Sequence, residues 1–154
     1  MTSNWQGYTN KMLFHSRLLL EAWNEAEDMA KPAFREACLN TMVQAYSSLL
    51  AEIMSNYQLP VSRLPDMDEA STAFSHKRES SSELNYIEQL LQQDSWLSAL
   101  LKAHLESVQP TPSPTHRIPV GSGAFNLNDQ EQVLQALESL KELVTYSRNF
   151  SLEW

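Results

Sequence analysis

Apolar residues recur every three or four positions along most of the chain, which is the spacing of an amphipathic α-helix. The first such segment covers residues 5–30. The second covers residues 32–57, and Pro32 suits its first turn, where a missing N–H group costs nothing. Because the connection between these segments is very short, we predict two antiparallel neighbours. Their apolar stripes contain Tyr8, Met12, Leu19, Ala22, Trp23 and Ala26, then Phe34, Cys38, Met42, Ala45, Leu49, Ile53 and Tyr57.

Two more segments of helical spacing follow. One covers residues 80–108, where Ser80 and Glu83 have the spacing of a capping box. Asp94-Ser95 offers a second cap, so this segment is either two helices or one helix with a break near Asp94. The last segment covers residues 129–150, with Asn128 and Glu131 as its capping pair.

The connections between these segments differ in composition. Residues 59–79 are mostly polar, and Ala70, Ala73 and Phe74 indicate one or two helical turns there. Residues 109–128 hold four prolines and two glycines, which is typical of a long loop. Four segments with one apolar stripe each must bury those stripes against one another. We therefore predict an all-α fold, a single domain over residues 1–154 built as an antiparallel four-helix bundle with a short extra helix and a long Pro-rich loop.

Composition excludes several classes of protein. Only three glycines occur in 154 residues, too few for a β-sandwich or a glycine-rich phosphate loop. The net charge of −8 comes without a basic stripe, so we expect neither a nucleic-acid partner nor an anionic membrane surface. Cys38 is the only cysteine, and no signal peptide or membrane span is visible. These features predict a cytoplasmic protein, with Cys38 a small buried residue rather than a nucleophile.

Two histidines are the candidates for a site in the core. His15 lies near the first apolar stripe and His104 lies among the apolar residues of the third segment. A first-row metal needs three or four ligands, and the Glu-x-x-His spacing of di-iron bundles is absent. We therefore predict no metal, no cofactor and no catalytic residue, and we keep His15 and His104 as candidate pocket or interaction residues.

Two other features could bind a partner or a ligand. Trp154 ends the sequence as given, and an aromatic tail either docks on the bundle or is displayed to another protein. Four cations lie near the first pair of helices and could hold an anion, namely Lys11, Arg17, Lys31 and Arg35. Trp154 is the third candidate interaction residue.

Two resemblances bear on this interpretation. Ribonucleases of the HEPN class carry an arginine followed four to six residues later by a histidine. No arginine in this sequence has a histidine at that distance, so we do not expect an active nuclease of this class. A HEPN-like bundle without the catalytic pair stays possible. The phrases from Tyr8 to Phe14, from Leu18 to Trp23, at Phe34-Arg35-Glu36-Ala37, from Trp96 to Leu101 and at the final Ser151-Leu152-Glu153-Trp154 resemble a family of small gammaproteobacterial helical proteins of unknown function. The resemblance implies a bacterial cytoplasmic helical protein and carries no activity, cofactor or site residue.

Elimination therefore favours a non-enzymatic helical bundle that acts through protein–protein contact, with another protein or with a second copy of itself. A bundle that binds a small ligand or an anion is the alternative. An enzyme whose site no linear motif reveals is the third hypothesis.

Overall fold

The computed structural model describes residues 3–110 and 125–152. Within these residues the fold is all-α, with six helices and no strand. The helices are α1 (Trp5–Glu25), α2 (Lys31–Asn56), α3 (Met67–Lys77), α4 (Ser82–Gln92), α5 (Trp96–Ser107) and α6 (Gln130–Leu152).

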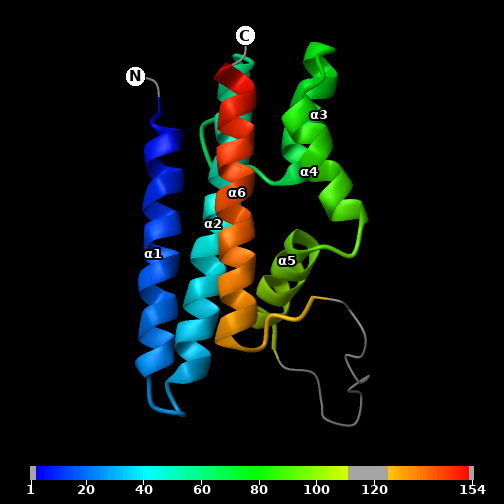
Figure 1. The fold of residues 1–154 in the computed structure, drawn as a ribbon. Helices are drawn as coiled ribbons and strands as arrows, with labels where there is room; N and C mark the ends of the chain where they lie inside the picture. The colour runs from blue at the N-terminus through cyan, green and yellow to red at the C-terminus, as the bar shows by residue number, and fades with distance from the viewer. Residues whose placement is uncertain (1–2, 111–124, 153–154) are drawn as a thin grey trace.

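The long helices α1, α2 and α6 lie side by side (Figure 1). The chain reverses between α1 and α2, and the contact between these two helices is the most extensive in the described part of the chain. The other long helix, α6, packs against both of them, while α5 packs against α2 and α6. The short helix α3 packs against α2 near its C-terminal end, where Phe74 contacts Tyr57. The helix α4 packs against α5 (Figure 1).

The predicted helical segments are found, with shifted ends. The first helix ends at Glu25, because Ala26 adopts an extended conformation, whereas the pattern predicted helix to residue 30. The segment 80–108 is divided into α4 and α5, and the Ser95 side chain caps α5 by accepting from the Ser98 N–H group. The last helix starts at Gln130 and reaches Leu152, two residues beyond the predicted end.

Two predicted caps are wrong by one residue. Ser81, not Ser80, caps α4: its backbone is extended and its hydroxyl accepts from the Leu84 N–H group. At α6 the Asp129 carboxylate accepts from the N–H group of Gln132 at 2.9 Å, and the Gln132 side chain accepts in return from the Asp129 N–H group. The sequence offers adjacent capping residues at both places, so spacing alone did not distinguish them.

The helix α3 is longer than the one or two turns predicted. Asp66 caps it by accepting from the Glu69 N–H group, and acidic residues occupy its first turn while His76 and Lys77 occupy its last. Both charge placements stabilise the helix dipole. Arg78 ends it in a left-handed conformation, with φ of 56°.

The core surrounds α2. Every residue from Ser48 to Met54 is buried, so this part of α2 is covered on all sides rather than along one stripe. On α1 the buried stripe is Thr9, Met12, Ser16, Leu20 and Trp23. Leu19, which the pattern placed on the core stripe, is only half-buried, because it lies to one side of the line of buried positions that runs through Met12, Ser16, Leu20 and Trp23.

Most of the predicted Pro-rich loop lies outside the described residues. Its last part is described: Leu127 is buried in the core and Phe125 is exposed. None of the helices in the described part of the chain combines the length and apolar character that a membrane span requires.

Candidate functional site

The two histidines singled out by the sequence lie on different helices. His15 is half-buried on α1, and His104 is half-buried on α5, where its Nε2 lies 3.2 Å from Asn40 Oδ1 on α2. Because α2 and α6 pack between α1 and α5, the fold separates the two imidazoles (Figure 1). Within the described ranges no three His, Cys, Asp or Glu residues gather as a metal site would need. Trp154 lies outside the described residues.

The four cations near the first pair of helices do not form one group. Lys31 and Arg35 line a common depression, of about 350 Å³, beside the start of α6. Acidic residues line it too, and Asp28 Oδ1 is 3.3 Å from Lys31 Nζ. Arg35 Nε donates to the backbone carbonyl of Leu127 at 2.9 Å. Burial lowers the pKa of Arg35. Both cations therefore already have partners.

Cys38 is a buried side chain packed between α1 and α2. Its Sγ donates to the Ser16 carbonyl at 3.4 Å, and burial raises its pKa to about 12. A thiol that holds its proton this firmly is a poor nucleophile. The prediction of a small buried residue is confirmed at this position.

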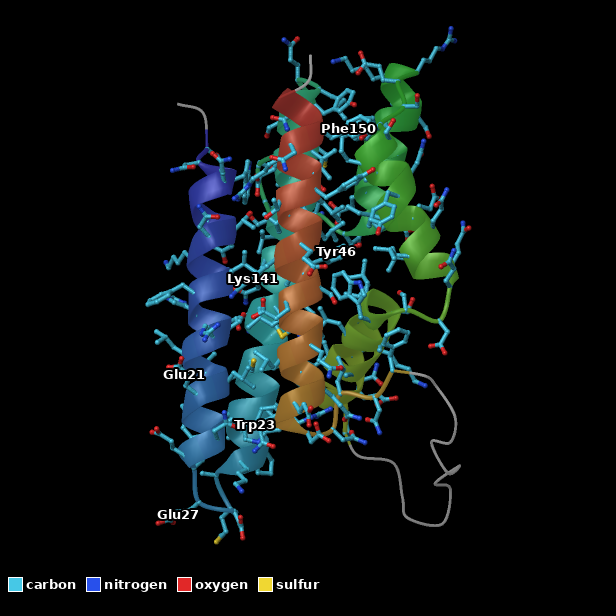
Figure 2. All side chains as sticks on the ribbon, viewed as in Figure 1. Glu21, Trp23, Glu27, Tyr46, Lys141 and Phe150 are labelled. Carbon is cyan, nitrogen blue, oxygen red and sulfur yellow. The ribbon has the colours of Figure 1, made fainter. Side chains whose placement is uncertain are left out.

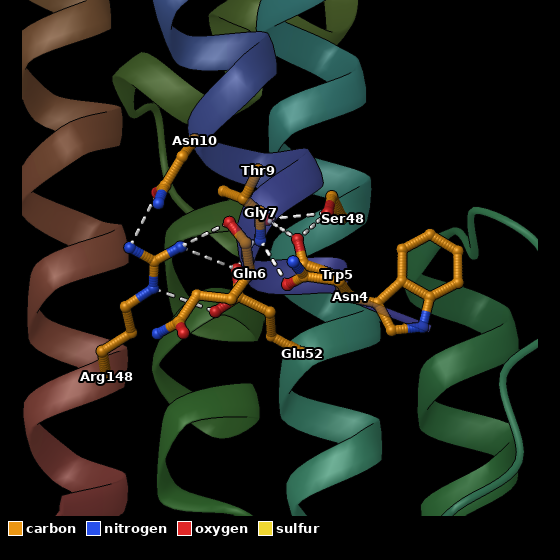
Figure 3. A network of polar contacts seen from close by, with 9 residues as sticks. All are labelled: Asn4, Trp5, Gln6, Gly7, Thr9, Asn10, Ser48, Glu52 and Arg148. Atoms are coloured by element: carbon orange, nitrogen blue, oxygen red, sulfur yellow. Dashed lines mark hydrogen bonds and ion pairs between the residues drawn. The ribbon is translucent and has the colours of Figure 1, made fainter. Parts of the chain in front are cut away.

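A polar cluster that the sequence reasoning missed joins α1, α2 and α6 (Figure 3). The Arg148 guanidinium on α6 forms two bonds to the Glu52 carboxylate on α2, from Nε at 2.9 Å and from Nη2 at 3.2 Å. Arg148 also donates to Asn10 Oδ1 at 2.9 Å and to the Gln6 carbonyl at 3.3 Å, both on α1. Glu52 is 8% exposed and the Arg148 side chain is 24% exposed, so this two-bond ion pair is buried at the carboxylate and partly open to solvent at the guanidinium.

Two hydroxyl groups complete the cluster. Thr9 Oγ1 lies 2.6 Å from Glu52 Oε2 and 2.7 Å from Ser48 Oγ, and Ser48 donates to the Trp5 carbonyl at 2.9 Å. Because an ionised carboxylate only accepts, the Thr9 proton is donated to Glu52. A hydroxyl beside a carboxylate is also the pairing that activates a nucleophile. However, both hydroxyl-bearing residues are fully buried, so a substrate has no access to them. The cluster joins α1, α2 and α6, and its Glu52–Arg148 pair lines a depression of about 260 Å³.

A second buried carboxylate lies at the start of α4. Glu83 Oε2 accepts from the Ser81 hydroxyl at 2.6 Å and from the Tyr57 hydroxyl at 3.2 Å. Both donors and the N-terminus of α4 stabilise negative charge at this point. This arrangement fixes α4 against the end of α2.

Two exposed aromatic residues meet where α4 faces α6, while the most exposed aromatic residue of the described part of the chain, Phe14, lies on α1. Tyr86 on α4 and Tyr146 on α6 have ring centres 5.0 Å apart, and Phe150 lies 6.1 Å from Tyr146. Figure 2 shows Phe150 near the C-terminal end of α6. Tyr86 and Tyr146 are 41% and 44% exposed, so each ring has one face in contact and much of its area open to solvent.

Two adjoining depressions follow this face. One of about 270 Å³ is lined by Tyr86, Leu90, Trp96, Ser139, Glu142, Leu143 and Tyr146. The other, of about 180 Å³, shares Trp96 and Ser139 with it and extends to Phe125 and Gln135. We call the two together the aromatic groove. Glu142 is its only charged lining residue, and the aromatic rings lie beside the uncharged polar residues Asn126, Gln132, Gln135 and Ser139, so the groove offers both apolar and hydrogen-bonding contacts.

The sequence reasoning did not find the groove. The tyrosines Tyr86 and Tyr146 lie just off the apolar positions Leu84, Ile87, Leu140 and Val144 of their segments. An aromatic residue at the edge of a stripe on each of two neighbouring helices is the signal that could have indicated it.

Comparison with known proteins gives a family and no function. No curated protein and no solved structure matches the chain. Residues 1–154 match a family described as a family of unknown function, DUF6586. The match covers the whole sequence, including the phrases whose resemblance to an uncharacterised family was noted above. The chain therefore belongs to DUF6586.

Proposed function

We propose that this protein is a non-enzymatic bacterial cytoplasmic protein that binds another protein through the aromatic groove. Its scaffold is a single-domain antiparallel four-helix bundle, in which α4 and α5 together form the third leg. The observation that carries the proposal is the pair of half-exposed tyrosines, Tyr86 and Tyr146, beside a depression of about 270 Å³. Tyrosine and tryptophan are the residues that most often anchor protein interfaces.

The occupant is an amphipathic helix of the partner protein. A groove between two helices accepts such a helix, which inserts its apolar side chains at i, i+3 and i+4. A volume of about 270 Å³ suits one or two large apolar side chains. Since Glu142 is the charged residue of the groove, the partner helix places a Lys or Arg beside its apolar anchors.

Binding of a small ligand or an anion is the second candidate, and the depression at Lys31 and Arg35 is its place in the fold. The ion pair of Lys31 with Asp28 at 3.3 Å weighs against it. Glu36 and Asp129 line the same depression and add negative charge. We therefore favour contact with a protein.

Affinity capture with quantitative mass spectrometry tests the proposal. The tagged wild-type protein, a Tyr86→Ala/Tyr146→Ala variant and a Leu105→Ala variant are expressed in the native host at equal levels. Leu105 is an exposed apolar residue of α5 that lines neither depression, so it is the matched control. We expect a protein that is captured by the wild type and by Leu105→Ala and is lost from the double variant. Capture that is equal for all three, or no specific capture, contradicts the proposal.

A further inference from the structure

The outer face of α1 carries an exposed stripe of its own. Lys11, Phe14, Leu18, Glu21 and Glu25 follow one another at intervals of three and four residues, which places them on one side of the helix. All five are exposed, and Phe14 and Leu18 are 62% and 46% exposed. The buried stripe of α1 faces α2, on the opposite side. Figure 2 shows Glu21 at the outer edge of α1.

This spacing is that of the contact positions of a coiled coil. At its middle are two large apolar side chains one turn apart, Phe14 and Leu18. A cation, Lys11, lies on the N-terminal side, and two carboxylates lie on the C-terminal side. An apolar centre between ends of opposite charge is complementary to a copy of itself that runs in the opposite direction.

We propose that α1 pairs antiparallel with α1 of a second copy of this chain, about a two-fold axis that crosses the outer face of α1 level with Ser16, whose own side chain is buried on the opposite face. Phe14 and Leu18 are each two residues from Ser16, so Phe14 of one copy packs on Leu18 of the other. Lys11 and Glu21 are each five residues away, so they also face each other across the axis. Such an interface is isologous, since the same patch serves both copies.

Charge distinguishes this arrangement from a parallel one. A parallel pair would place Lys11 against Lys11 and Glu21 against Glu21, and like charges across an interface are unfavourable. Within the described residues no acidic side chain pairs with Lys11, which leaves its ammonium group for a carboxylate of the second copy. Glu21 is 3.5 Å from Arg17 in an exposed ion pair, which competes little with a new partner.

The interface is small, because a single helix of each copy contributes to it. It falls in the class below about 1,200 Å² of total buried area, which is typical of weak association. We therefore expect a monomer–dimer equilibrium that depends on protein concentration. The proposal does not rest on the aromatic groove, which lies on the far side of α6 from α1.

Sedimentation velocity of the purified full chain, from about 10 to about 500 µM, tests the pairing. We expect the average mass of the wild type to rise toward that of a dimer with concentration. Phe14→Glu places a carboxylate at the apolar centre, and we expect it to remain monomeric throughout. Tyr86→Ala/Tyr146→Ala is the matched control and is expected to dimerise as the wild type does, so the two proposals fail separately.

A charge exchange tests the register. Lys11→Glu alone and Glu21→Lys alone each bring like charges together, and we expect each to weaken dimerisation about tenfold. The double variant Lys11→Glu/Glu21→Lys restores the opposite pairs, keeps the net charge of −8, and is expected to dimerise within about twofold of the wild type. A monomeric wild type, a dimeric Phe14→Glu, or a double variant as weak as the single ones would overturn the proposal.

Cross-linking reports the direction of pairing. Lys11→Cys and Glu21→Cys variants are mixed and oxidised, and the native Cys38 stays silent because it is buried. We expect the disulfide between the two different variants to exceed the disulfide within either one. A predominance of like-with-like disulfides contradicts antiparallel pairing.

Discussion

Arg148 and Tyr146 lie two residues apart on α6, yet they belong to regions of opposite character. Arg148 enters a polar cluster in which its guanidinium contacts groups of α1 and α2, and Glu52 is nearly buried beneath it. Tyr146 lies on the aromatic groove, where much of its apolar ring faces solvent. One side of α6 thus buries charge, and the other exposes apolar surface.

The contrast separates what holds the fold together from what is left for contact. Removing one partner of a buried ion pair leaves the other charge without compensation, so substitutions in such a pair lower the free energy of unfolding. Half-exposed aromatic rings gain little from the fold and can gain more from a partner. Substitutions in the polar cluster should therefore lower the stability of the fold, whereas substitutions in the aromatic groove should mainly affect binding.

Removing the cation of the cluster should have the largest effect. Arg148→Met leaves the Glu52 carboxylate without its ion-pair partner, so we expect a loss of about 3 kcal/mol in the free energy of unfolding, measured by urea denaturation. The double variant Glu52→Gln/Arg148→Met removes the charge that is left, and it should be more stable than Arg148→Met alone. A loss below about 0.5 kcal/mol for Arg148→Met would mean that the cluster does not hold the helices together.

Alkaline pH should lower the free energy of unfolding, because the core holds protonated groups that titrate in the unfolded chain. Burial raises the pKa of the Cys38 thiol from 9.0 to about 12, and burial also raises the pKa of the Tyr46 hydroxyl. Above pH 9 the unfolded chain releases the Cys38 proton while the native chain keeps it, so stability falls as pH rises from about 9 to about 12, by up to about 1.4 kcal/mol per pH unit for this group. Urea melts of the wild type and of Cys38→Ala measure the slope, which should be shallower in the variant. Equal slopes would contradict the assignment.

Removing one hydroxyl of the cluster should have a smaller effect. Thr9→Val keeps the shape of the side chain but takes away the proton donated to Glu52 at 2.6 Å. We expect a loss of about 1–2 kcal/mol, because the buried Glu52 Oε2 then loses its shorter hydrogen bond and keeps only the one from Arg148 Nη2 at 3.2 Å. Thr145→Val, at an exposed position of α6, is the control and should change stability by less than about 0.5 kcal/mol. If both variants behave alike, the Thr9 bond contributes nothing.

The smallest effect on stability is expected in the groove. Tyr86→Ala/Tyr146→Ala removes a pair of half-exposed rings whose centres are 5.0 Å apart. We expect a loss of about 1 kcal/mol or less, since such pairs contribute about that much beyond their burial. Thermal melts followed by circular dichroism measure it. A loss as large as that of Arg148→Met would place these rings in the scaffold.

The helices were predictable from the sequence because their apolar spacing and proline positions act locally. Pro32 at the start of α2 and Ser95 at the start of α5 mark boundaries that the structure reproduces. Which helix lies at the centre was not predictable, since burial of every residue from Ser48 to Met54 depends on how the other five helices pack around α2.

The candidate site was not predictable for a related reason. Thr9 and Glu52 fall in phase with buried apolar residues, and no spacing in the sequence marks them as partners. Glu52 and Arg148 are 96 positions apart, and only the packing of α6 on α2 brings them together. His15 and His104 were singled out by residue type, and the fold places them on separate sides of α2 and α6.

We propose that the aromatic groove binds a partner protein and contributes little to the stability of the fold. The most direct test places the photo-reactive amino acid p-benzoylphenylalanine at Gln135, an exposed residue of the groove, and at Thr72 on α3 as a control, in the native host. We predict an adduct with one partner protein from position 135 and none from position 72. The adduct should disappear in Tyr86→Ala/Tyr146→Ala while that variant stays folded. An adduct that survives the double substitution, or no adduct from position 135, would contradict the account.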